Sequence, residues 1–130
     1  MLQSKDKVAI YMEGHLESDF GKMGFGAMRY LVNDIVAVID SAQAGRVMSD
    51  FMSTSRSIPV VASLEESIAL GAEVLLLGIA PVGGKIPDFW YETLDKAIDS
   101  GVSLINGLHD LLAPRYEGRL RQNWVWDVRV

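Results

Sequence analysis

Two histidines and one lysine stand out as side chains that could do chemistry in this sequence: His15, His109 and Lys85. An imidazole can transfer protons near neutral pH or ligate a metal, and an ammonium can hold a carboxylate or phosphate. Each of the three follows an apolar run, where a strand gives way to a loop. A histidine in a loop can equally be a surface or hydrogen-bonding residue. The chain has no cysteine, which excludes thiolate nucleophiles, thiolate metal sites and disulfides.

The loop after the first apolar run, residues 13–26, is rich in glycine but matches no standard phosphate-binding motif. Gly14 and Gly21 enclose six residues instead of four, and Lys22 is followed by Met23, so the loop is not a Walker A P-loop. Residues 21–26 read G-x-x-G-x-G, which also misses the dinucleotide fingerprint G-x-G-x-x-G.

Two interpretations of Gly24 and Gly26 stay open. A helix is expected to begin at Ala27, and its free backbone amides beside these glycines could hold an anion. Alternatively, the glycines only permit a long loop and close packing of the helix on the sheet.

Polar and glycine residues also follow the second, fourth and fifth apolar runs. Asp40 could bind a sugar hydroxyl, or it could cap the turn that follows. The Gly83-Gly84-Lys85 triplet could present amides and a cation to an anion, or form a simple turn between prolines. The full set of expected ligand contacts is His15, Gly24, Gly26, Asp40, Gly83, Gly84, Lys85, Asn106 and His109.

A parallel, helix-covered sheet would bring these loops together. Short apolar runs rich in β-branched residues alternate with helix-length segments, which predicts βαβ units. The strand order 3-2-1-4-5 would place the loops after strands one, four and five at one crevice, where open α/β sheets bind ligands. We therefore expect one three-layer, Rossmann-like α/β domain over residues 1–130, with strands at 8–12, 35–39, 59–61, 74–77, 102–105 and 124 to about 128.

The fold prediction also covers the last strand and the residues that should be most buried. Residues 123–130 alternate between two faces, with Trp124 and Trp126 on the same face. We expect both to pack on apolar side chains, within the subunit or across a contact with another copy, in a strand of open direction. The most buried residues should be Ile10, Tyr11, Val36, Val38, Leu75, Leu77 and Leu104, since central strands are covered on both faces.

Composition narrows the classes of partner. The net charge of −5 opposes binding to nucleic acid or to anionic membranes. No signal peptide or membrane-length apolar stretch is recognisable, and together with the missing cysteines this favours a cytoplasmic location.

Several segments resemble the amino-terminal domain of the domain-of-unknown-function family numbered 1611: residues 8–15, 22–26, 28–30, 38–41 with 44–45, 78–84 and 126–129. The resemblance implies a Rossmann-like domain that precedes a P-loop domain, in a family of which some members are assigned as N-acetyltransferases acting on D-glutamate. The sequence contains no P-loop motif of its own.

Three functional hypotheses follow. We favour a Rossmann-like domain that binds a small anionic metabolite, a nucleotide or coenzyme A, as part of a larger enzyme with a P-loop domain as its partner. A free-standing nicotinamide-dependent oxidoreductase and a non-catalytic oligomerisation module are the alternatives. We also expect the chain to form a homo-oligomer. No metal is expected, and catalysis by this chain alone is left open.

Overall fold

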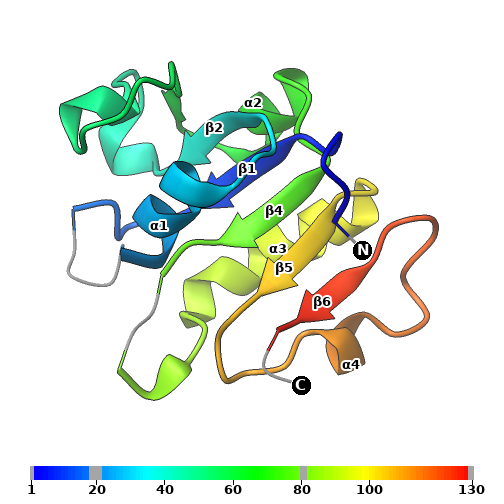
Figure 1. Ribbon diagram of the computed structural model, residues 1–130. Helices are drawn as coiled ribbons and strands as arrows, with labels where there is room; N and C mark the ends of the chain where they lie inside the picture. Colours follow the sequence, from blue (N-terminus) through cyan, green and yellow to red (C-terminus); the bar gives the residue numbers. More distant parts are fainter. Residues whose placement is uncertain (1, 18–21, 80–81, 129–130) are drawn as a thin grey trace.

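Six parallel strands form a single sheet at the centre of the molecule (Figure 1). The computed structural model describes residues 2–17, 22–79 and 82–128. The strand order is β3-β2-β1-β4-β5-β6, which confirms the expected order and settles that the last strand runs parallel to its neighbour. The strands are β1 (Val8–Tyr11), β2 (Ile35–Ile39), β3 (Val60–Val61), β4 (Val74–Leu77), β5 (Ser103–Asn106) and β6 (Val125–Asp127).

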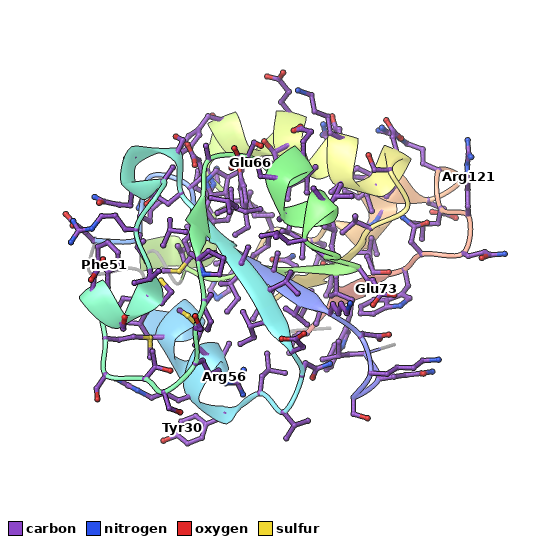
Figure 2. The ribbon with its side chains drawn as sticks, turned by 90° about the horizontal axis from the view of Figure 1, so that it is seen from above. Tyr30, Phe51, Arg56, Glu66, Glu73 and Arg121 are labelled. Carbon is purple, nitrogen blue, oxygen red and sulfur yellow. The ribbon has the colours of Figure 1, made fainter. Side chains whose placement is uncertain are left out.

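Helices cover both faces of the sheet and make the fold a three-layer α/β structure. Seen from above, α1, which ends at Tyr30, lies on one side of the sheet, and α2, which carries Glu66, lies with α3 on the other side (Figure 2). No helix in the described part of the chain is long and apolar enough to cross a membrane. The helices are α1 (Lys22–Tyr30), α2 (Leu64–Ala69), α3 (Tyr91–Asp99) and α4 (Ala113–Tyr116), with 3₁₀ turns η2 (Ser41–Gln43), η3 (Met48–Asp50), η4 (Val82–Gly84) and η5 (Asp88–Trp90).

Helix α1 begins five residues earlier than the sequence predicted, so Gly24 and Gly26 lie inside it. The Gly24 amide donates to the carbonyl of Gly78, at the end of β4, over 3.0 Å. A Cβ on Gly24 would lie 2.7 Å from Met12 Sδ and 3.1 Å from that carbonyl oxygen. Gly24 therefore brings the helix close to the sheet, as the packing interpretation proposed.

The strand residues alternate between two apolar clusters, one on each face of the sheet. On β1, Ala9 and Tyr11 face the cluster beneath α2 and α3, whereas Val8 and Ile10 face the cluster beneath α1. Six of the seven residues expected to be most buried are 0–3% exposed. The prediction for Val36 was wrong, because it is only partly buried beneath the short helix α2.

Strand β6 is held to β5 by backbone and side-chain bonds. The Leu104 amide donates to the Trp124 carbonyl over 3.0 Å, and the Val128 amide donates to the Asn106 carbonyl over 2.8 Å. Trp124 packs against the α1-side cluster, whereas Trp126 keeps 37% of its surface exposed. The segment thus completes the sheet within the subunit.

Candidate functional site

The loop after β1 is tied to the end of β2 by Asp40, whose side chain is buried. Its Oδ1 accepts hydrogen bonds from the amides of Gly14 (3.3 Å) and Ala42 (3.1 Å), and its Oδ2 accepts one from the amide of Leu16 (3.0 Å). The bond to Ala42 caps η2, as one of the two interpretations expected. With three backbone donors on two oxygens, the carboxylate organises the loop.

Glu13, the second residue after β1, is held at the same edge. The amide of Ser41 donates to Glu13 Oε1 over 2.7 Å, and the Ser41 hydroxyl donates to Oε2. Trp90 Nε1 donates to the Glu13 carbonyl over 3.0 Å, and the His15 ring lies edge-on to Trp90 with centroids 6.3 Å apart. The Glu13 carboxylate is therefore held in position by its two bonds from Ser41.

The loops after β4 and β5 also meet. The His109 amide donates to the Gly84 carbonyl over 2.7 Å, and a Cβ on Gly84 would lie 2.5 Å from His109 Cγ. Asn106 is buried: its Nδ2 donates to Asp127 Oδ1 and to the Asp110 carbonyl, and its Oδ1 accepts from the Leu108 amide. The Asn106 amide group is thus occupied by the protein itself.

The remaining residues selected from the sequence are more exposed or less closely packed. Lys85 and Gly83 are exposed on the turn after β4. A Cβ on Gly26 or Gly83 would meet nothing within 4 Å. The three loops therefore share the carboxyl edge of the sheet. Gly24 lies where α1 contacts the end of β4, Gly84 and His109 lie where the β4 and β5 loops meet, and Lys85 and Gly83 lie at the periphery.

A cavity of about 280 Å³ opens at this edge, between the ends of β1 and β2 and the helices α2 and α3. None of the nine residues expected to bind ligand lines it. Polar side chains reach it from the β1 loop and from both helices, and Ile39 and Leu64 contribute apolar surface. The lining residues are Tyr11, Glu13, Ile39, Ala62, Ser63, Leu64, Glu65, Phe89, Thr93 and Lys96.

Tyr11 supplies a neutral hydroxyl to this cavity. Burial raises the pKa of Tyr11 to about 12, a hydrogen bond with Thr93 acts in the opposite direction, and the nearby charges of Glu13 and Asp40 raise it further. The phenol therefore stays protonated at neutral pH and can donate a hydrogen bond. Its ring is anchored by an edge-on contact with Trp90, with centroids 4.5 Å apart.

A larger hollow, of about 500 Å³, lies at the opposite end of the sheet, where β4 and β5 begin. Glu73 and Arg121, both labelled in Figure 2, border it together with Asp6 and Trp124. Open α/β sheets bind ligands outside the carboxyl ends of their strands. We therefore regard the smaller cavity, at the carboxyl ends of β1 and β2, as the candidate site.

Sequence reasoning overlooked the residues that line this cavity. Glu13 follows the first strand as Asp40 follows the second, and this shared position could have identified Glu13 as a candidate. Thr93 and Lys96 were harder to identify from the sequence, since their spacing of three residues only places them on one face of a helix. Only the packing of α3 against β1 turns that face toward Tyr11.

A parallel sheet covered by helices on both faces, with a cavity at its carboxyl edge, defines a Rossmann-like α/β domain. The model of the family described as "Domain of unknown function (DUF1611_N) Rossmann-like domain" matches residues 41–130, and the chain belongs to that family.

Solved and curated relatives agree with this assignment. The crystal structure of a DUF1611 family protein from Anabaena variabilis superposes with a TM-score of 0.88 at 38% identity, over 97% of this chain and 37% of that one. A D-glutamate N-acetyltransferase from Tritonibacter scottomollicae is 46% identical over 50 residues, which are 38% of this chain and 15% of the relative. A D-glutamate N-acetyltransferase from a Pseudoalteromonas species is 38% identical over 50 residues, which are again 38% of this chain and 15% of the relative. The chain thus matches only a minor part of each relative's length.

Proposed function

We propose that this chain is the metabolite-binding, Rossmann-like part of an N-acetyltransferase that acts on an amino acid. The observation that carries the proposal is its 46% identity, over 50 residues, to a protein named D-glutamate N-acetyltransferase. A second relative of the same name supports it. The P-loop domain implied by the family resemblance would be the partner, and an acyl donor such as coenzyme A would bind with its help.

The carboxyl-edge cavity supports a small ligand better than a dinucleotide. Its volume of about 280 Å³ is at the lower limit of ligand pockets, which typically span about 300–1,000 Å³. A dinucleotide would also use free amides at the start of the helix after β1. The Gly24 amide, in the first turn of that helix, already donates to Gly78. These features favour an amino acid over a nicotinamide cofactor.

In the proposed reaction, the amine nitrogen of the amino acid attacks the thioester carbonyl of the acetyl donor. A carbon–nitrogen bond forms, the carbon–sulfur bond breaks, and the amine loses a proton while the leaving thiolate gains one. This chain would bind and orient the amine-bearing substrate.

Isothermal titration calorimetry tests the proposal directly. The chain is titrated separately with D-glutamate, L-glutamate, acetyl coenzyme A and NAD. We expect heat of binding with D-glutamate and none with NAD. Binding of NAD without binding of either glutamate enantiomer would refute the acetyltransferase assignment and favour a nicotinamide enzyme.

The same titration tests the residues selected from sequence. Lys85→Gln removes the cation on the turn after β4. A loss of glutamate affinity in this variant would place the ligand in the crevice between the β4 and β5 loops, near His109. Unchanged affinity would remove Lys85 from the site.

A further inference from the structure

We propose that the carboxyl-edge cavity is a site for a small zwitterion, in which Glu13 receives an ammonium group and Lys96 receives a carboxylate. The inference rests on the proposed function, and it names the charged groups that would recognise the amine-bearing substrate. The two side chains belong to different walls of the cavity, one on the loop after β1 and the other on α3.

The Glu13 carboxylate is held by the protein in a position to accept a cation. Ser41 donates one hydrogen bond to each of its carboxylate oxygens, from the backbone amide and from the hydroxyl. Each carboxylate oxygen can accept two hydrogen bonds, and among the residues that the structure describes Ser41 is the one donor to each, so a ligand can take the second position. The bond from Trp90 Nε1 to the Glu13 carbonyl fixes the backbone as well. Little conformational entropy is then lost when a ligand binds.

Among the described residues that line the cavity, Lys96 supplies the only positive charge. Its ammonium lies 3.5 Å from Glu92 Oε1, one helical turn earlier, and both side chains are largely exposed. Exposed pairs at this spacing are weak, so a bound carboxylate can compete for the ammonium.

The balance of charge selects a zwitterion over an anion. Glu13 and Glu65 contribute two carboxylates to the lining and Lys96 contributes one ammonium. A purely anionic ligand meets two carboxylates and only one ammonium, whereas a ligand that also carries an ammonium gains Glu13 as a partner for it. The Tyr11 hydroxyl lines the same cavity and can donate a further hydrogen bond.

Calorimetric titration with D-glutamate and with glutarate, which lacks the amine, tests the inference. We expect the chain to bind D-glutamate at least about tenfold more tightly than glutarate, a ratio within the range for a hydrogen bond between charged groups. Glu13→Gln should weaken D-glutamate binding about tenfold and remove that preference. Lys96→Gln should weaken both ligands about threefold, because its ammonium is exposed.

Glu117→Gln and Lys5→Gln are matched controls that remove the same charges at exposed positions outside the cavity, and both should leave the affinities unchanged. Thermal melting of every variant checks that it is folded. D-Glutamate binding that is insensitive to Glu13→Gln and Lys96→Gln would overturn the inference and leave the proposed function standing. Binding of another amino acid through Glu13 and Lys96, with no binding of D-glutamate, would support the zwitterion site and refute the D-glutamate substrate. A chain that binds no amino acid would overturn the zwitterion site.

Discussion

Replacing Asp127 with alanine should strongly destabilise the fold, because this one carboxylate attaches the last strand to the loop after β5. Its Oδ1 accepts from the Leu112 amide and from Asn106 Nδ2, both over 2.9 Å. Its Oδ2 accepts from the amides of Leu112 (3.1 Å) and Ala113 (2.9 Å). Asp127 is 8% exposed and Leu112 is fully buried, so water cannot readily replace these bonds.

The magnitude follows from the donors left without a partner. Asn106 Nδ2 keeps its second bond to the Asp110 carbonyl, whereas the amides of Leu112 and Ala113 lose their acceptor. The unsatisfied Leu112 amide is buried and costs about 1–3 kcal/mol, and the part-buried Ala113 amide adds a smaller cost. We therefore expect Asp127→Ala to lower the free energy of unfolding by about 2–4 kcal/mol, a large share of the typical 5–15 kcal/mol.

Urea unfolding followed by tryptophan fluorescence measures this loss. Asp99→Ala is the matched control, because Asp99 pairs with Arg119 at the surface over 2.9 Å with 62% of its side chain exposed. That variant should lose less than about 1 kcal/mol. If Asp127→Ala lost no more than Asp99→Ala, the role assigned to Asp127 would be refuted, and the placement of β6 with it.

Three further predictions concern the core, the cavity and the loop contact. Leu75→Ala should cost about 2–5 kcal/mol in urea unfolding, because Leu75 is fully buried in a central strand; a cost below about 1 kcal/mol would contradict that placement. Tyr11 has a pKa raised to about 12, so the stability it contributes is complete below pH 10 and is lost as the pH rises toward 12. Denaturation at a series of pH values should therefore show a steeper loss between pH 10 and 12 in the wild type than in Tyr11→Phe, and equal slopes would be contrary evidence. Gly84→Ala should be less stable than Gly83→Ala by about 1–3 kcal/mol, since both glycines have positive φ but only Gly84 lies against His109; equal melting temperatures would argue against that contact.

The order of the strands was predictable because parallel βαβ units leave a strong local pattern. Strands β2 and β4 have the bounds expected from their apolar runs. Short β-branched runs separated by helix-length segments have few alternatives once crossovers must be right-handed and connections short. The direction of β6 was not predictable, since an alternating strand of this length can pair in either direction.

The sequence by itself determined the fold class and the edge of the sheet where the loops gather. It also determined the alternation of strand side chains between the two faces of the sheet, which divides the core into two clusters. Only the tertiary structure decided what each polar residue does at that edge. Asp40 and Asn106 are expected ligand contacts, and in the structure Asp40 Oδ2 accepts from the Leu16 amide and Asn106 Nδ2 donates to Asp127, partners that are distant in sequence. Tyr11 looked like core and Lys96 like helix surface, yet both line one cavity. Strand and helix patterns are local in sequence, whereas a cavity is made by side chains that only the packing of α3 on the sheet brings together.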